Sequence, residues 1–321
     1  MTDTRTFQAL YEDKIGRVQT VAGLALLGAG SFLGRSIYPL LEKSGVRVTC
    51  FSRRPVSFCK RWRRLDLPDF PVAVDELRDY EVMVFAVAAG VQSTGSLPDL
   101  PLLYWINAFY PLQIMSQLDV SAWKGRWISF GSYFEIGCGA DKPFDEEGVL
   151  GSLGTSPNQY CATKRALSRG VAFGRWSFAV HHFILPTIYG VGEENSRIIP
   201  YVFGLLRNGQ VPKLSSGTQV RQYLHTRDIG DLVLRTLAGE VRPGCFNAAP
   251  DNHIQIRELV CSIYSLFGSD TPPAFGSLET RDESMRFLAL NGDRLRDVSG
   301  WSPRVTLHDG LKEYMNPKHI A

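Results

Sequence analysis

A glycine-rich segment near the start of the chain constrains the fold more than any other feature. Its residues, Gly28-Ala-Gly-Ser-Phe-Leu-Gly34, follow the apolar run 22–27 and precede the segment 32–44, for which we predict a helix. Glycine tolerates unusual backbone angles and lets the backbone approach a pyrophosphate closely. The N-terminus of the following helix offers unpaired N–H groups to an anion. The segment therefore predicts a strand, a tight turn and a helix that bind a dinucleotide, with a purely structural turn as the alternative.

Apolar and helical segments alternate along the first half of the chain. We predict further strands at residues 46–51, 82–87, 127–130 and 178–185, and helices near 106–118 and 158–173. Such alternation produces right-handed βαβ units, so the expected class is α/β, a doubly wound parallel (Rossmann) sheet with a smaller C-terminal substrate-binding lobe. The expected division is an N-terminal extension (1–20), a dinucleotide-binding domain (21–185, with 223–249 returning to it) and the lobe (186–222 and 250–321).

Composition narrows the classes of protein and partner. The 321 residues are 44% hydrophobic and 21% charged, which is ordinary for a globular protein, and the net charge of +3 does not suggest nucleic acid or an acidic membrane as a partner. We find no signal peptide and no apolar segment long enough to span a bilayer. The six cysteines include no Cys-x-x-Cys pair. We therefore expect a cytoplasmic protein with free thiols, no metal site, and no nucleic-acid or membrane partner.

The residues after the second predicted strand favour NADP(H) over NAD. An NAD site places a carboxylate there, about 20 residues beyond the glycine turn, to bind the ribose hydroxyls. This chain has Ser52, Arg53 and Arg54 instead. A hydroxyl and guanidinium groups suit a 2′-phosphate, because they form charge-assisted hydrogen bonds with its oxygens. The alternative is a solvated basic face that these arginines share with the basic residues of segment 60–64.

Tyr160 and Lys164 are four residues apart in a predicted helix and so share one face. A phenol, with a reference pKa of about 10, transfers its proton poorly near neutral pH, and a neighbouring ammonium lowers that pKa. Tyr160 then serves as the general acid when a carbonyl is reduced, or as the base in the reverse direction. A Ser or Thr after an inner strand should polarise the substrate oxygen, and the candidates are Ser129 and Ser132.

These motifs resemble the extended short-chain dehydrogenase/reductases, the NAD-dependent epimerase/dehydratase family. The glycine turn resembles the family fingerprint, with Ser31 where glycine is usual, and aligning Glu135-Ile-Gly137 with the family's Val-Tyr-Gly selects Ser132 over Ser129. Asp66 resembles the acidic residue that meets the adenine. The resemblance implies that the cofactor contacts are Gly28, Gly30, Ser31, Phe32, Leu33, Gly34, Ser52, Arg53, Arg54, Asp66, Leu67, Ala88, Lys164 and Pro186.

The later part of the chain resembles the nucleotide-sugar branch of this family. Segment 212–228 is similar to the nucleotide-sugar-binding segment of 4-ketoreductases of the CDP-paratose/CDP-abequose synthase kind. The resemblance implies that Arg221 binds the diphosphate. It adds Tyr133, Phe134, Asn195 and Arg197 as further substrate contacts. It also implies a homodimer formed through the helices near 106–118 and 158–173.

Three reactions share this scaffold. A 4,6-dehydratase needs an acid pair directly after the catalytic hydroxyl, where this chain has Tyr133 and Phe134. A 4-epimerase ends with its cofactor unchanged and usually shows the NAD pattern, whereas a reductase consumes NADPH. The arginines therefore favour reduction of a 4-keto group on a nucleotide-linked deoxysugar. The alternatives are a 4-epimerase with tightly bound NAD(P), C3/C5 epimerisation using Cys138, and a catalytically silent dinucleotide-binding regulator. Of His181 and His182, at least one is expected to be an internal, hydrogen-bonded histidine.

Overall fold

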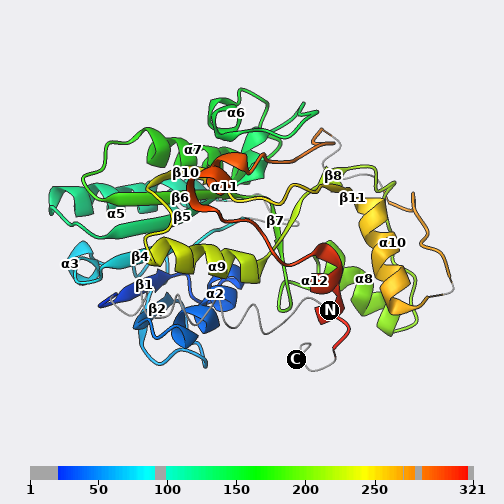
Figure 1. Ribbon diagram of the computed structural model, residues 1–321, viewed down its shortest axis with the longest axis horizontal. Helices are drawn as coiled ribbons and strands as arrows, with labels where there is room; N and C mark the ends of the chain where they lie inside the picture. Colours follow the sequence, from blue (N-terminus) through cyan, green and yellow to red (C-terminus); the bar gives the residue numbers. More distant parts are fainter. Residues whose placement is uncertain (1–20, 91–98, 270, 279–283, 317–321) are drawn as a thin grey trace.

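A parallel sheet flanked by helices forms the larger part of the molecule, on the left in Figure 1. The structure is a computed structural model that describes residues 21–90, 99–269, 271–278 and 284–316. Within these residues the sheet has seven strands in the order β10-β6-β5-β4-β1-β2-β3. The strands are β1 (Leu24–Leu27), β2 (Val48–Ser52), β3 (Trp62–Arg64), β4 (Val82–Phe85), β5 (Arg126–Ser132), β6 (Ala179–Leu185) and β10 (Gly244–Asn247). This arrangement confirms the predicted α/β class with a doubly wound parallel sheet.

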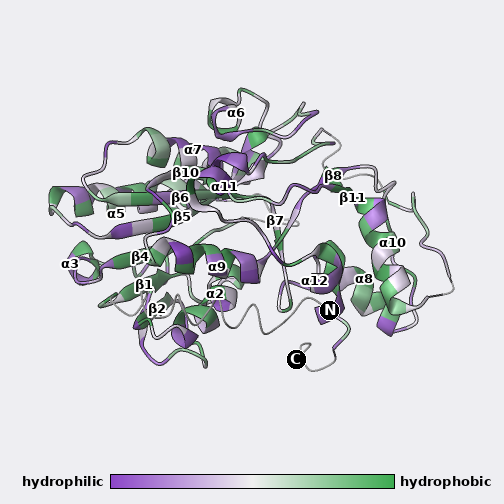
Figure 2. Ribbon diagram, viewed as in Figure 1, coloured by the Kyte–Doolittle hydropathy of each residue, from purple (hydrophilic) through white to green (hydrophobic). Residues whose placement is uncertain are grey.

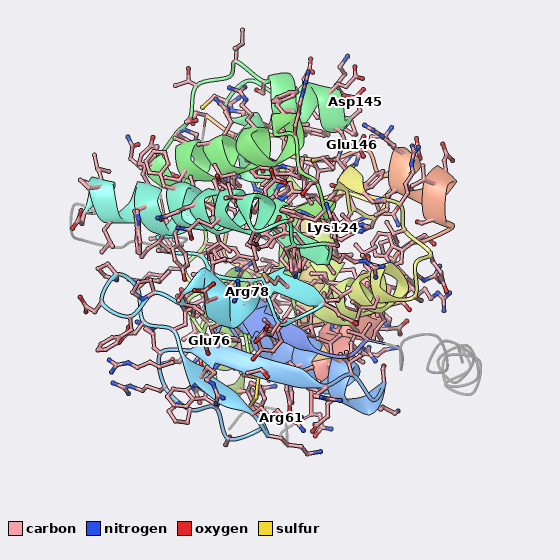
Figure 3. All side chains as sticks on the ribbon, turned by 90° about the vertical axis from the view of Figure 1, so that its left-hand side faces the viewer. Arg61, Glu76, Arg78, Lys124, Asp145 and Glu146 are labelled. Carbon is pink, nitrogen blue, oxygen red and sulfur yellow. A yellow bond between two sulfur atoms is a disulfide. The ribbon has the colours of Figure 1, made fainter. Side chains whose placement is uncertain are left out.

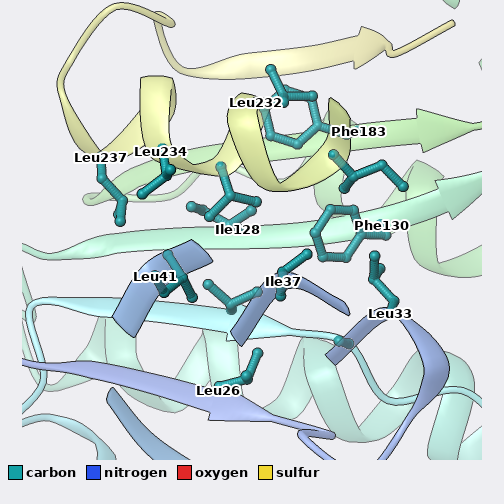
Figure 4. Close-up of a cluster of buried hydrophobic side chains, with 14 of the residues drawn as sticks. Leu26, Leu33, Ile37, Leu41, Ile128, Phe130, Phe183, Leu232, Leu234 and Leu237 are labelled. Atoms are coloured by element: carbon teal, nitrogen blue, oxygen red, sulfur yellow. The ribbon is translucent and has the colours of Figure 1, made fainter. Parts of the chain in front are cut away.

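Helices cover both faces of the sheet. One face carries α2 (Phe32–Lys43), α9 (Thr226–Leu237) and α11 (Asp293–Ser299), and the other carries α3 (Val74–Leu77), α5 (Tyr110–Val120) and α7 (Gln159–Phe173). Successive side chains of a strand point to opposite faces, so in β1 Leu24 and Leu26 join the first core whereas Ala25 and Leu27 join the second. Figure 4 shows the first core, where side chains of α2 and α9 pack against the strands. Two apolar cores therefore fix the sheet between two helical layers.

Sequence features near the helix ends explain where the main helices start and stop. The Ser31 side chain caps α2, and the Asn158 side chain caps α7 by accepting from the backbone N–H of Cys161 at 3.0 Å. Gly45, with φ of +79°, follows the end of α2. On the face of the sheet opposite α2, one continuous helical segment precedes β5. It runs from α4 (Leu100–Tyr104) through the π-helical turn η1 (Trp105–Phe109) into α5.

A second group of elements packs beside the carboxyl ends of the strands. Its core is formed by α8 (Ile198–Arg207), α10 (Ile256–Phe267) and α12 (Leu307–Glu313). Two small sheets accompany it, the parallel pair β7 (Thr187–Tyr189) and β9 (Tyr223–His225) and the antiparallel pair β8 (Val220–Arg221) and β11 (Ile254–Gln255). The 3₁₀ turn η2 (Tyr133–Ile136) and α6 (Glu146–Gly151) follow β5. Helix α10 carries both hydrophobic and hydrophilic residues (Figure 2), as expected for a helix with one buried face, whereas α9 is buried along almost its whole length.

Several elements differ from the sequence-based expectations. The strand expected at 127–130 continues to Ser132, and β3 was not predicted. The return of the chain to the main sheet is visible in the pairing of β10 with β6. The exact division into two lobes stays a prediction, and the N-terminal extension 1–20 lies outside the described residues. None of the described helices is both long and apolar enough to cross a membrane.

The expectation that all cysteines are free thiols was wrong. Cys50 and Cys59 form a disulfide, at the lower edge of the view in Figure 3 near Arg61. Cys50 lies in β2 opposite Trp62 of β3, and the chain must fold back between these strands. This return brings Cys59 beside Cys50, a contact that sequence spacing alone does not reveal. Among the described residues no group of His, Cys, Asp and Glu is arranged to hold a metal ion.

Candidate active site

The predicted site residues gather at one edge of the central sheet. Because the strands are parallel, their carboxyl ends meet at the same edge, where ligands of doubly wound folds bind. The residues at or just beyond these ends, in the spatial order of the strands, are Asp66 after β3, Ser52 of β2, Gly28 after β1, Ala88 after β4, Ser132 of β5 and Pro186 after β6. The fold therefore aligns residues from six separate segments along a single edge.

The glycine turn is shaped by close backbone contacts. Gly28 has φ of +88°, and a Cβ there would lie 2.7 Å from the carbonyl carbon of Ala86. A Cβ on Gly34 would lie 2.3 Å from the carbonyl oxygen of Gly28. By contrast, a Cβ on the exposed Gly30 would meet its nearest neighbour, Ser52, at an ordinary 3.6 Å. Gly28 and Gly34 are therefore required by the turn itself, while a side chain at the exposed Gly30 would make only ordinary contacts.

Gly30 lies just before the start of α2, the place where a doubly wound fold binds a dinucleotide pyrophosphate. The side chain of Ser31 accepts a hydrogen bond from the N–H of Gly34 at 3.0 Å, so its own proton can be donated to an anion. Phe32 and Leu33 begin the helix, and the first N–H groups of a helix have no intrahelical acceptor. The glycine turn therefore has donors for a dinucleotide phosphate.

Ser52 and the two arginines after it have different roles. The Ser52 hydroxyl donates to the carbonyl of Arg54 at 2.7 Å and accepts from the indole N–H of Trp62 at 3.0 Å. Its side chain therefore shapes the turn after β2. Arg53 and Arg54 are exposed and directly follow Ser52, whose side chain lies beside Gly30 of the glycine turn. Asp66, further along the same edge, is half-buried and pairs with Arg64 at 3.2 Å, and Leu67 beside it is also half-buried.

Tyr160, Ser132 and Lys164 come together as the sequence predicts. Tyr160 is half-buried, and its hydroxyl interacts with the side chain of Ser132, the last residue of β5. Lys164, one turn further along α7, is buried and donates from Nζ to the carbonyl of Phe130 at 2.6 Å. Ser129 lies inside the strand and bonds His182 instead, at 2.8 Å. The geometry thus brings Ser132, and not Ser129, to the tyrosine.

Asn107 connects the loop after β4 to this cluster. Its side-chain amide accepts from the N–H of Ala89 at 2.8 Å and donates to the carbonyl of Ala89 at 2.9 Å. It also donates to the hydroxyl of Thr163 at 3.0 Å, on the helix that carries Tyr160. This triple contact fixes the position of the exposed Ala88 relative to the tyrosine.

The electrostatic surroundings of the tyrosine differ from the sequence-based expectation. Burial raises the pKa of Tyr160, and so does the nearby carboxylate of Glu135. The strongest influences that lower this pKa are the charge of Arg197 and the hydrogen bond with Ser132. Burial lowers the pKa of Lys164, and Glu135 raises it. Sequence reasoning assigned the lowering of the phenol pKa to Lys164, whereas the structure points first to Arg197.

The predicted substrate contacts fall into two groups. Arg197 lies near Tyr160, where its Nε pairs with Glu193 at 2.8 Å and Nη2 donates to the carbonyl of Ile188 at 2.9 Å. Asn195 is exposed close by in the chain. Arg221, by contrast, is buried, and its Nη1 donates to the carbonyls of Val220 and Met285 at 2.9 and 2.8 Å. Its guanidinium thus already holds two backbone segments together.

The two aromatic residues after Ser132 also differ in exposure. Tyr133 is fully buried, and its hydroxyl lies 2.5 Å from that of Thr187. Phe134 is half-buried. Only Phe134 therefore presents surface to a ligand in this structure.

Two buried carboxylates of the site were missed by the sequence analysis. Glu135 accepts from the N–H of Ser132 at 2.7 Å, and it occupies the place where the family pattern has valine, which was a visible signal. Glu193 receives a hydrogen bond from Tyr314 and pairs with Arg197. Burial raises the pKa of Glu193 to about 7. Its role depends on contacts between distant segments, so no local pattern announced it.

Two curated relatives are similar to the chain over most of its length. A CDP-abequose synthase of Yersinia pseudotuberculosis is 24% identical over 92% of this chain and 98% of its own length. A CDP-abequose synthase of Salmonella typhimurium is 21% identical, over 90% of this chain and 95% of its own length.

Solved structures with the same fold agree with the arrangement described above. MoeE5 in complex with UDP-glucuronic acid and NAD superposes with a TM-score of 0.77, at 23% identity over 92% of this chain and 99% of MoeE5. The UDP-glucuronic acid 4-epimerase of Bacillus cereus, in complex with UDP-glucuronic acid and NAD, gives 0.77 at 15% identity over 91% of this chain and 98% of its own.

The model of the NAD dependent epimerase/dehydratase family matches residues 24–249, which include the glycine turn, Ser132, Tyr160 and Lys164. This match covers more than half of the chain and confirms the expectation of an NAD(P)-dependent oxidoreductase. The chain therefore belongs to the NAD dependent epimerase/dehydratase family.

Proposed function

We propose that the protein is an NADPH-dependent reductase of a 4-keto group on a nucleotide-linked deoxysugar. The observation that carries this proposal is that the side chains of Tyr160 and Ser132 interact at the carboxyl end of β5, with Lys164 one helical turn away. Two hydroxyls that meet beside a dinucleotide turn can hold a carbonyl oxygen and protonate it. The similarity to CDP-abequose synthases over most of the chain supports a nucleotide sugar as the substrate.

In the proposed reaction each residue handles the carbonyl oxygen or its proton. A bound nicotinamide dinucleotide supplies the hydride. Ser132 donates a hydrogen bond to the ketone oxygen, which polarises the carbonyl, and Tyr160 gives its proton to the same oxygen as negative charge develops there. Arg197 contributes positive charge beside the phenol, which favours release of its proton. Lys164 lies one helical turn away and is proposed to add to this charge.

The side chains at the edge of the site support reduction over the other reactions of the family. Tyr133 and Phe134 occupy the two places after the catalytic hydroxyl, so the acid pair of a dehydratase is absent there. Arg53 and Arg54 are exposed and directly follow Ser52, which lies beside the glycine turn, and two guanidinium groups at this position suit a 2′-phosphate. Arg197 and the exposed Asn195 are the proposed contacts of the substrate.

The proposal is tested by mixing the purified protein with 4-keto deoxysugars linked to CDP, dTDP, GDP or UDP. We expect oxidation of NADPH with at least one of them. An Arg53→Ser/Arg54→Ser variant should raise the KM for NADPH about tenfold or more, because two phosphate contacts are lost, and the KM for NADH should change little. Interconversion of 4-epimers without consumption of NADPH would replace the proposal by the epimerase alternative. Binding of NADPH with no turnover of any of these sugars would favour the silent regulator.

A further inference from the structure

A chain of buried polar side chains lies directly beneath the proton-handling residues. Glu135, Ser168, His182 and Ser129 are each no more than 1% exposed. Glu135 accepts from the N–H of Ser132 at 2.7 Å and is hydrogen-bonded by Ser168. His182 lies 2.7 Å from the Ser168 hydroxyl through Nε2 and 2.8 Å from the Ser129 hydroxyl through Nδ1. The proposed mechanism uses none of these four side chains.

The hydrogen bonds of this chain run in one direction. Burial raises the pKa of Glu135 to about 7, and in its ionised form the carboxylate only accepts hydrogen bonds, so Ser168 then donates its proton to Glu135. Burial, together with the charge of Lys164, lowers the pKa of His182 to about 3, so its ring is neutral. The Ser168 oxygen then accepts from Nε2–H, and Nδ1 accepts from Ser129. Every donor in the chain therefore points toward Glu135, which is the arrangement that stabilises a buried negative charge.

One glycine of β5, Gly131, leaves room for these polar side chains. A Cβ on Gly131 would lie 2.7 Å from the Ser168 hydroxyl, 2.8 Å from Oε1 of Glu135 and 2.8 Å from Nε2 of His182. Three polar side chains from β6, α7 and the turn after β5 thus converge on the place where Gly131 lacks a side chain. A strand buried on both faces is ordinarily lined by apolar residues, so three polar side chains that meet beside β5 form an unusual cluster.

We propose that Glu135 is a positioning residue of the active site, whose buried side chain fixes the backbone of Ser132 and, when ionised, places a negative charge in the enclosed space that it shares with Lys164. The titratable groups that face this carboxylate are Tyr160, Lys164 and Arg165 from α7, His182 from β6 and Cys245 from β10. Of these, Lys164 and Arg165 bring positive charge, and Arg165 donates to the backbone carbonyl of Glu135 at 2.8 Å. Lys164 is fully enclosed and holds a backbone carbonyl with Nζ, so its charge depends on a nearby anion.

The consequence for the proton chemistry has a definite sign. The carboxylate of Glu135 raises the pKa of both Lys164 and Tyr160. Replacing it by a neutral amide of the same shape should therefore lower both pKa values. Lys164 would lose its charge at a lower pH, and any activity that needs the ammonium would decline at a lower pH as well. This effect on activity rests on the proposed function, whereas the charge of Lys164 can be measured without a substrate.

The test is an NMR titration of lysine labelled at Cε, with the Lys164 signal assigned by its loss in Lys164→Arg. We expect the pKa of Lys164 in Glu135→Gln to fall by about one unit or more. Glu135→Asp keeps the charge and should restore most of the wild-type value. The matched control is Glu146→Gln, since Glu146 is also buried and accepts from a backbone N–H, that of Asn247, at 2.8 Å. Glu146 is the first residue of α6, at the top of Figure 3, and the Glu146→Gln substitution is expected to leave the Lys164 titration unchanged.

An unchanged Lys164 titration in a folded Glu135→Gln protein would overturn the proposal, whatever the substrate proves to be. Should Glu135→Gln not fold, Ser168→Ala provides the second variant, because it removes one donor to the carboxylate and raises its pKa. A smaller fall in the Lys164 pKa is then expected, and no fall would again contradict the role of Glu135. Where turnover is measurable, the alkaline limb of the pH profile should move in step with the Lys164 titration.

Discussion

At the scale of single residues, the site is a set of side chains whose properties are changed by burial. Lys164 is buried and Tyr160 is half-buried, and this burial moves the pKa of the phenol upward and that of the ammonium downward. Both shifts oppose the charged forms. The surrounding charges decide how far each shift goes, with Arg197 acting on the phenol and Glu135 acting on both groups. The sequence shows which residues form the site, but it does not show that Arg197 and Glu135 lie beside them.

Removing the phenol hydroxyl is the most direct test at this scale. Tyr160→Phe keeps the ring in its half-buried place and removes the proposed acid, so kcat should fall by about 10²–10⁴-fold. Binding of the dinucleotide should change little, because the glycine turn is untouched. Steady-state kinetics and fluorescence titration with NADPH measure the two effects separately. Unchanged turnover with intact cofactor binding would remove Tyr160 from the mechanism.

At the scale of elements, the site depends on how helices and strands pack. Helix α9, which comes long after the cofactor-binding segments in the chain, packs against α2, whose N-terminus forms part of the glycine turn. Leu232 of α9 and Ile37 of α2 are both fully buried in the same core (Figure 4). The position of the phosphate-binding turn is therefore supported by a helix from the other half of the sequence.

A core substitution tests this support. Leu232→Ala should lower the free energy of unfolding by about 2–5 kcal/mol, because it removes buried methyl groups and leaves a cavity. Urea unfolding followed by circular dichroism measures the change. The matched control is Val120→Ala, since Val120 is 86% exposed and should alter stability by no more than about 0.5 kcal/mol. Equal effects of the two substitutions would contradict the proposed role of this core.

At the scale of the whole molecule, the face formed by η1 and α7 carries apolar side chains that water reaches. Phe109 of η1 is 58% exposed and Phe173 of α7 is 70% exposed. Phe109 also lines an apolar pocket with Leu100 and Trp105. We expect two copies to pair through this face about a two-fold axis, which would cover these rings.

Light scattering on the eluting protein tests the dimer. The wild-type chain should elute with twice its own mass at micromolar concentration, and Phe109→Asp/Phe173→Asp should shift it toward the monomer because charge is placed in the apolar face. Val211→Asp is the control, since Val211 is also exposed but lies in the second group of elements. A monomeric wild-type protein would contradict the expected assembly.

The sequence by itself determined the features that depend on local chemistry. Glycines that a tight turn requires, a serine that caps a helix, and a tyrosine and lysine one helical turn apart are set by neighbours in the chain, so the strand, the turn and the proton-handling pair were predictable. Only the tertiary structure decided which distant groups surround them. The Cys50–Cys59 disulfide, the burial of Arg221 and the polar chain that ends at Glu135 all arise where separate segments meet. These features depend on packing contacts and on the exclusion of water between segments that are far apart in the sequence, so no local sequence pattern predicts them.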